Sequence, residues 1–340
     1  MATISDYLRL VKFSHTIFAM PFALLSFTYA WQTTDTQQSL WLLLLQVIGC
    51  MVFARNVAMG FNRWADRKID AENPRTAGRE IPAGKISAKG AMWFVVVNAL
   101  LFIAVAATIN PLCGWLSPVA LFVVMFYSYC KRFTSLAHIV LGISLGIAPV
   151  GAYMAVTGTS AVECWLLALV VMTWCAGFDI IYALQDAEFD RKRGLHSIPS
   201  RFSARTSLII SALLHLVSIA LLVVFATYQP QSWLLYVGCA LFAAILLSEH
   251  YIVTPTRQRN IGIAFGTFNA LASLSLATFL IANLLLIDPH YYQISGVDEN
   301  DRDVTNHLSY LILDAADSIN ISCNLTVRVH ENCDPKFLEK

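Results

Sequence analysis

The sequence predicts an all-α membrane protein, a polytopic bundle of nine transmembrane helices followed by a short soluble C-terminal extension. Of the 340 residues, 57% are apolar and only 13% are charged, whereas an ordinary soluble domain carries roughly a quarter charged residues. The chain also contains nine apolar stretches near the length, roughly 20 residues, that a helix needs to cross a bilayer. The low charge excludes most soluble enzymes. The formal net charge of +1 excludes a strongly basic protein that binds nucleic acid, and we expect the lipid bilayer as a partner instead.

The nine predicted spans are joined by polar connections, of which two are long, at residues 62–90 and 185–207. The third and fourth spans are separated only by Asn110 and Pro111. We expect the first span to be retained, because no convincing small-residue cleavage site of a signal peptide is present. The predicted spans cover residues 16–32, 40–61, 91–109, 112–130, 136–156, 162–184, 208–228, 233–253 and 261–287.

Positive charges lie on one side of the predicted bundle. Residues 1–287 contain 19 Lys and Arg, and 18 of these precede the first span or follow the second, fourth, sixth or eighth span. The loops after the first, third, fifth and seventh spans contain none. Because positively charged loops stay in the cytoplasm, we expect a protein of the bacterial cytoplasmic (inner) membrane. Its N-terminus is expected in the cytoplasm and its C-terminus outside.

The charge balance divides the chain into two predicted domains. Residues 1–287 contain 19 basic and 12 acidic residues, whereas residues 288–340 contain 4 basic and 10 acidic residues. The near-neutral whole therefore combines a positively charged membrane domain with an acidic C-terminal extension. Fifty residues are too few to bury a substantial core of their own.

Two groups of aspartates lie at predicted helix ends on the cytoplasmic side. In RNVAMGFNRWADRKID, which starts at Arg55, the first group places Asn62, Asp66 and Asp70 on one helix face at intervals of four residues. We call these three residues the first aspartate motif. In FDIIYALQDAEFD the spacing recurs, and Tyr182, Asp186 and Asp190 form the second aspartate motif, preceded by Asp179.

Two carboxylate pairs that face each other suit a hard divalent cation. Mg²⁺ prefers oxygen ligands and is commonly shared between one or two carboxylates and the phosphates of a substrate. The simpler alternative is that these aspartates are solvated residues at helix ends that pair with neighbouring Arg and Lys. A cation-binding transporter is a second alternative, but transporters usually carry their intramembrane charges near the middle of a span. The repeated motif therefore favours an enzyme.

The two motifs resemble those of the UbiA superfamily of intramembrane prenyltransferases. The signature N-x-x-x-D-x-x-x-D is matched by the first aspartate motif, and Y-x-x-x-D-x-x-x-D by the second. NPRTAGREIPAGKIS (73–87) and YSYCKRFT (127–134) look like the family's loops after the first motif and after the fourth span. The resemblance covers about residues 5–287. Arg63 departs from it, because many members carry a second acidic residue at that position.

The resemblance implies a nine-helix bundle around a cavity, in which Mg²⁺ binds the diphosphate of an isoprenyl donor. By position, the Mg²⁺–diphosphate set is Asn62, Asp66, Asp70, Asp186 and Asp190. Candidate partners of the diphosphate are Arg55, Arg79, Lys131 and Arg132. Two further residues, Asp179 and Tyr182, are candidates to orient the acceptor or receive its proton, with a structural role between helices as the alternative.

Histidines provide further candidates for the acceptor site. His196 lies in the second long loop, and His15, with Lys12, lies at the cytoplasmic mouth of the first span. For each of them an ordinary surface or interfacial role is the alternative. His138, His215 and His250 are expected to be isolated and structural.

By resemblance, the expected function is transfer of a polyprenyl group from polyprenyl diphosphate to an aromatic acceptor in quinone biosynthesis. The overall likeness is to 4-hydroxybenzoate polyprenyltransferases. FNRWAD and LQDAEFDRKRGLHSIP also resemble the branch that serves futalosine-derived menaquinone synthesis, whose acceptor is an aminodeoxyfutalosine. Both acceptors remain open at this point, and with them a role in ubiquinone or in menaquinone biosynthesis.

The C-terminal extension resembles a different family. Residues 291–340 look like an internal piece of a glycyl radical enzyme of the pyruvate formate-lyase type, through GVDENDRDVTNHLSY and NLTVRVH. Neither the catalytic cysteine loop nor the glycyl-radical motif of that family is recognisable. We therefore expect a truncated fragment without activity, and an acidic extension of chance similarity is the alternative.

Overall fold

The computed structural model describes residues 2–12 and 19–286. The chain divides into two units, Met1–Pro289 and His290–Lys340, and the second lies outside the described residues. The predicted extension and the candidate residue His15 therefore fall outside the part of the chain that is described.

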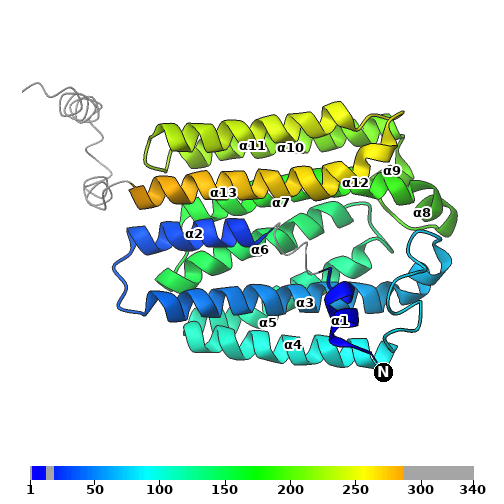
Figure 1. The fold of residues 1–340 in the computed structure, drawn as a ribbon, viewed down its shortest axis with the longest axis horizontal. Coiled ribbons are helices and arrows are strands. Elements are labelled where there is room, and N and C mark those ends of the chain that lie inside the picture. Colours follow the sequence, from blue (N-terminus) through cyan, green and yellow to red (C-terminus); the bar gives the residue numbers. More distant parts are fainter. Residues whose placement is uncertain (1, 13–18, 287–340) are drawn as a thin grey trace, which may run out of the picture. The chain divides into compact units, whose positions relative to one another are not determined.

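The described residues are helical, with polar turns between the helices (Figure 1). Most of the long helices begin at a residue with extended backbone, and Ser87, Asn110 and Ser203 accept a hydrogen bond from the first turn as side-chain caps. The α-helices are α1 (Ile4–Leu10), α2 (Met20–Thr33), α3 (Leu40–Glu72), α4 (Ala88–Ile109), α5 (Pro111–Cys130), α6 (Ala137–Thr157), α7 (Val162–Ala183), α8 (Ala187–Arg193), α9 (Ile198–Arg201), α10 (Ala204–Ala226), α11 (Trp233–Ile252), α12 (Ile261–Ile263) and α13 (Asn269–Leu286).

The predicted spans agree with these helices to within a few residues at most ends. Among the described residues, eight helical segments are long and apolar enough to cross a membrane, rather than the nine expected. The difference is α2, which has 14 residues and directly follows the undescribed segment 13–18. α2 nevertheless packs within the bundle, against α6 and α13.

The helices lie alongside one another in two groups joined through α2 and α6 (Figure 1). α3, α4 and α5 pack together, and α7, α10, α11 and α13 form the other group. Trp174 of α7 is fully buried and contacts Phe22 and Phe242, with ring centroids 5.1 and 6.2 Å away. This aromatic cluster ties α2, α7 and α11 together.

α6 and α7 approach each other closely because α6 carries glycine where the two backbones meet. A Cβ atom at Gly142 would lie 2.3 Å from the carbonyl oxygen of Met172, and one at Gly146 would lie 2.8 Å from that of Ala168. Small residues four apart are a common means of close helix packing in membranes. This contact places the start of α6 beside the end of α7, where the candidate site lies.

The outer surface of the bundle is apolar, as a lipid-facing surface requires. Trp41, Trp115 and Trp233 are 75%, 83% and 68% exposed. All three lie at helix starts on the side opposite the aspartates. Tryptophan at this position is typical of the membrane–water interface.

Candidate active site

A cavity of about 850 Å³ runs between α3, α4, α5, α6 and α7. Its lining is polar at the end where α3 and α7 carry the aspartate motifs, and apolar along most of its remaining length. Both motifs line it, together with Asp179. The structure therefore brings together side chains that lie more than 100 residues apart in the sequence.

The first aspartate motif lies on one continuous helix, as predicted. α3 extends for 33 residues through Glu72. Asp66 is 1% exposed; its carboxylate oxygens lie 2.5 Å from Lys131 Nζ and 3.1 Å from a guanidinium nitrogen of Arg132. Arg79 donates to Asp70 Oδ1 at 2.7 Å, and the other oxygen of Asp70 makes no hydrogen bond within the described residues.

The second aspartate motif has the same sequence spacing as the first, but it is not carried by one continuous helix. α7 ends at Ala183, a 3₁₀ turn spans Leu184–Asp186, and α8 then starts at Ala187. Asp186 therefore lies in a tighter turn than α-helical spacing would give. Asp190 lies on α8 and accepts a hydrogen bond from Ser197 Oγ at 3.2 Å.

Arg75 connects the loop after the first motif to the second motif. Its guanidinium contacts both carboxylate oxygens of Asp186, with Nε 2.8 Å from Oδ1, and it donates to the Tyr182 hydroxyl at 3.0 Å. Asn73 donates to the same Asp186 oxygen at 2.9 Å. Although burial disfavours its charge, the hydrogen bonds to Asp186 raise the pKa of Arg75 above its ordinary value, so the guanidinium stays protonated.

Asp179 forms a hydrogen bond that the sequence does not suggest. Its Oδ2 lies 2.7 Å from Nδ1 of His138, which is 3% exposed at the start of α6. The expectation that His138 is isolated is therefore wrong. Tyr182 also lines the cavity, and its ring centroid lies 4.2 Å from that of Phe265, in a π-helical turn at Ala264–Phe268.

Three further basic residues line the same end of the cavity. Arg63 is 6% exposed, and no hydrogen bond or ion pair joins its guanidinium to the described residues. Arg55 donates to the carbonyl oxygen of Lys12 at 3.4 Å, and its Nε is buried without a partner in the described part of the chain. Burial lowers the pKa of Lys12. These side chains give the polar end a positive charge that nearby carboxylates do not fully neutralise.

The remaining predicted residues differ in their relation to the cavity. Lys131 and His196 line it, whereas Arg132 is not part of the lining and donates to Asp66 and to the carbonyl oxygens of Ala65 and Ser128. The His196 backbone donates to the Lys131 carbonyl at 2.7 Å, which fixes the second loop to the end of α5.

His215 and His250 form a pair away from the cavity. Their nitrogens lie 3.0 Å apart, and His215 Nδ1 lies 3.9 Å from the buried carboxylate of Glu249. Neither histidine is isolated, contrary to the expectation. Neither lines the cavity, and His215 Nε2 also lies 3.3 Å from the carbonyl oxygen of Trp174, so these contacts join α10 to α7 and α11.

Sequence reasoning missed Arg75, Asn73, Ser197, His138 and Arg63. Arg75 and Asn73 lie in the 73–87 segment, and Ser197 follows His196. Their positions in the two long loops beside the aspartate motifs could have marked them as candidates. His138 carried only a weak signal, a polar residue in the first turn of an otherwise apolar span.

The carboxylates fit Mg²⁺ if phosphate or water supplies further ligands. Within residues 2–12 and 19–286, no three His, Cys, Asp or Glu side chains converge to form a metal-binding cluster. Each motif does offer two carboxylates, and one oxygen of Asp70 is buried without a hydrogen-bond partner in that same part. Mg²⁺ sites built from one or two carboxylates and substrate phosphates have this composition.

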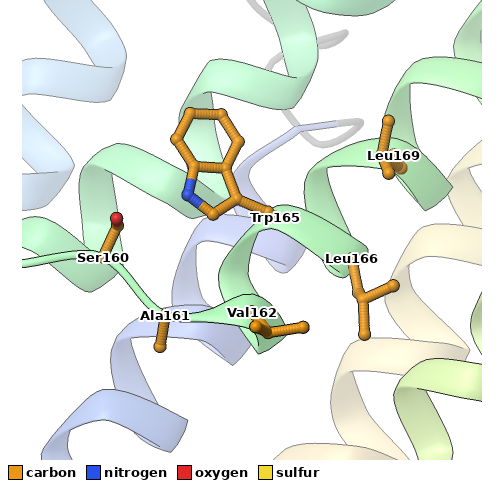
Figure 2. Close-up of a pocket in the computed structure, with 6 residues that line it drawn as sticks. All are labelled: Ser160, Ala161, Val162, Trp165, Leu166 and Leu169. Carbon is orange, nitrogen blue, oxygen red and sulfur yellow. The ribbon is translucent and has the colours of Figure 1, made fainter.

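The apolar end of the cavity lies where α4 ends and α5 and α7 begin. Trp165 and Leu169 line the cavity there and also line a second, open pocket of about 450 Å³ (Figure 2). Figure 2 shows that this pocket is formed by the first turns of α7 and the preceding residues Ser160 and Ala161. A long apolar ligand has room along the whole depth of the bundle.

Comparison with known proteins identifies similarities for both parts of the chain. Residues 19–274 match the profile of the UbiA prenyltransferase family, and residues 289–340 match a profile described as pyruvate formate lyase-like. A 4-hydroxybenzoate octaprenyltransferase of Yersinia enterocolitica is 34% identical over 207 residues, which are 61% of this chain and 69% of that protein. One of Tolumonas auensis is 30% identical over 252 residues, 74% of this chain and 87% of that protein.

Solved structures share the fold. The apo structure of a UbiA homolog from Aeropyrum pernix K1 has a TM-score of 0.67 and 29% identity, covering 80% of this chain and 97% of its own. A UbiA homolog from Archaeoglobus fulgidus bound to GPP and Mg²⁺ has a TM-score of 0.60 and 20% identity, covering 79% of this chain and 99% of its own.

Proposed function

Since the chain belongs to the UbiA prenyltransferase family and is an integral membrane enzyme of that class, we propose that it transfers a polyprenyl group from polyprenyl diphosphate to 4-hydroxybenzoate, with Mg²⁺, in quinone biosynthesis. The observation that carries this proposal is the cavity. Two carboxylate pairs and several basic side chains occupy one end, and an apolar channel leads away from them. This arrangement matches a ligand with a charged head and a long apolar tail.

The basic residues bind the diphosphate of the donor. Lys131 and Arg79 already contact Asp66 and Asp70 of the first motif, and Arg75 contacts Asp186 of the second. Cationic side chains placed where negative charge develops on a leaving group stabilise its departure. The apolar lining excludes water, which would otherwise capture the allylic cation.

The aspartate motifs are the residues that would hold Mg²⁺, namely Asn62, Asp66, Asp70, Asp186 and Asp190. When bound, the ion would neutralise the diphosphate leaving group. The homolog from Archaeoglobus fulgidus, solved with GPP and Mg²⁺, supports this choice of metal.

The acceptor binds between the diphosphate site and Asp179. Asp179 and Tyr182 line the cavity beside the second motif and are placed to orient an aromatic ring and receive its proton. His196 lies at the mouth of the cavity, where it has access to an acceptor carboxylate or hydroxyl. The names of the Yersinia and Tolumonas relatives favour 4-hydroxybenzoate over an aminodeoxyfutalosine acceptor.

The positive loops support an orientation in which the aspartate motifs lie at the cytoplasmic face of the inner membrane, with the N-terminus inside and the C-terminus outside. Residues 288–340, which match a different family profile, take no part in the proposed prenyl transfer.

The test is pyrophosphate release and product formation by the purified full-length protein in detergent or lipid. We expect both with a polyprenyl diphosphate and 4-hydroxybenzoate, and neither after removal of divalent metal with EDTA. An acceptor panel that includes an aminodeoxyfutalosine discriminates the two acceptors. Absence of pyrophosphate release with every acceptor would contradict the proposed function.

A further inference from the structure

His138 makes two hydrogen bonds that together define which of its nitrogens carries the proton. The backbone N–H of Ile198 points at Nε2, with the two nitrogens 3.3 Å apart, and Nδ1 lies 2.7 Å from Asp179 Oδ2. A backbone N–H only donates, so Nε2 must accept with its lone pair. In the neutral ring the proton then lies on Nδ1 and is donated to the carboxylate of Asp179.

The surroundings leave His138 little freedom to adopt another arrangement. The residue is 3% exposed, and both ring nitrogens are engaged. It lies four residues before Gly142, where the backbones of α6 and α7 touch. Because the helices cannot separate there without losing that packing, the imidazole stays within reach of Asp179.

His138 also connects the two functional parts of the cavity. Ile198 follows Ser197, which donates to Asp190 of the second aspartate motif. The same imidazole therefore contacts Asp179 on one side and the loop that supports Asp190 on the other. Among the described residues, His138 is the side chain that donates a hydrogen bond to Asp179.

Asp179 itself is only partly enclosed. Its side chain is 21% exposed, and it lines the cavity. Oδ2 is engaged by His138, whereas Oδ1 has no hydrogen bond to the described residues. A carboxylate that lines the cavity, with one oxygen held and the other without a hydrogen bond to the described residues, is suited to act as a positioned general base.

We propose that His138 is a positioning residue for the transfer reaction, which holds Asp179 in the orientation that accepts the proton lost from the acceptor ring. This inference rests on the proposed function. The donor's C–O bond breaks and its electron pair leaves with the diphosphate, while a ring carbon of the acceptor forms the new C–C bond. The proton on that carbon passes to Asp179, and the C–H electron pair restores the aromatic ring. His138 keeps its own proton throughout.

The test compares two substitutions of His138 in the full-length protein. His138→Leu removes both hydrogen bonds, whereas His138→Asn keeps an N–H donor near the position of Nδ1. We expect kcat to fall about 10- to 100-fold in the Leu variant, since small misplacements of a catalytic group have effects of this size. The KM for the donor should change little, and the Asn variant should recover most of kcat.

A ring-deuterated acceptor provides a readout that a purely structural role would not change. If proton removal is slowed in His138→Leu, this variant should show a primary isotope effect on kcat. The effect should be smaller in the wild type and in His138→Asn. The matched control is His215→Leu, which removes a buried histidine outside the cavity; it is expected to lower Tm without an isotope effect.

Two results would overturn the inference: a His138→Leu variant that folds with wild-type kcat, or equal losses in the Leu and Asn variants without an isotope effect. Either is distinct from failure of the proposed function, in which the wild-type protein would itself form no prenylated product.

Discussion

The two aspartate motifs have the same spacing but are supported in different ways. The first lies on the continuous helix α3, and its carboxylates pair with Lys131, Arg132 and Arg79. The second crosses a 3₁₀ turn and is held by side chains from other segments, above all Arg75 and Ser197. A continuous helix therefore presents one half of the proposed diphosphate site, and two loops assemble the other half. The predictions below test this difference.

The largest effect is expected from removing one carboxylate charge in each motif. Asp66→Asn and Asp186→Asn should each lower the rate of pyrophosphate release about 100-fold or more, because charge stabilisation of the leaving group is lost. Their stabilities should differ. Asp66 is buried against two cations, so its loss should cost about 1–3 kcal/mol, whereas Asp186→Asn should leave Tm nearly unchanged. Thermal unfolding measures the stability of each variant, and a pyrophosphate-release assay measures its rate.

Asp35→Asn is the control for this pair, since Asp35 is exposed in the turn between α2 and α3 and should behave as wild type. Equal Tm losses in Asp66→Asn and Asp186→Asn would remove the contrast between the motifs.

Arg75→Ala is expected to have the next largest effect, because this residue joins the first loop to the second motif. The KM for the donor should rise about tenfold, which corresponds to about 1.4 kcal/mol. The double variant Arg75→Ala/Asp186→Asn should lose less donor affinity than the sum of the two single variants, since both remove the same contact. Lys68→Ala, an exposed basic residue on α3, is the control. Fully additive losses would mean that the Arg75–Asp186 contact does not support donor binding.

Arg63 is a further difference between the motifs. Beside the first motif it adds a buried cation with no ion partner among the described residues. Arg63→Met should raise Tm, because an unpaired buried charge is costly. The same change should raise the KM for the donor about fivefold, roughly 1 kcal/mol, because a binding charge is lost. A higher Tm together with weaker donor binding would identify Arg63 as a ligand-binding residue. A lower Tm together with weaker donor binding would indicate a structural residue.

The contrast between the motifs also explains which features could be predicted from the sequence. Eight of the nine apolar stretches, and the spacing in the first motif, correctly predicted long helices in the described residues, because both depend on local periodicity. The 3₁₀ turn at Asp186 could not be predicted, since it coincides with contacts to Asn73 and Arg75, more than 100 residues away. His138 and Asp179 are likewise 41 residues apart and meet because Gly142 brings α6 against α7.

A smaller effect is expected from the two loop glycines that have left-handed backbone conformations. Gly84 has φ +72° and Gly194 has φ +70°, and a Cβ atom at either would meet no neighbour within 4 Å. Alanine at each should therefore cost about 1 kcal/mol of stability through backbone strain alone. Gly194 ends α8, which carries Asp190, so only Gly194→Ala should also raise the KM for the donor, by about twofold. Equal KM values in the two variants would contradict the dependence of the second motif on its loop.

The smallest effect, none, is expected from deleting residues 291–340. Lys131, Arg132, Arg79, Arg75 and Ser197, which support the two motifs, all lie before the deletion begins, and so does α13, which ends at Leu286. The truncated protein should keep the wild-type kcat and KM in the release assay. If activity is lost while Asp66 and Asp186 are intact, the extension would have to be assigned a role in the reaction, and the membrane domain alone would not be the enzyme.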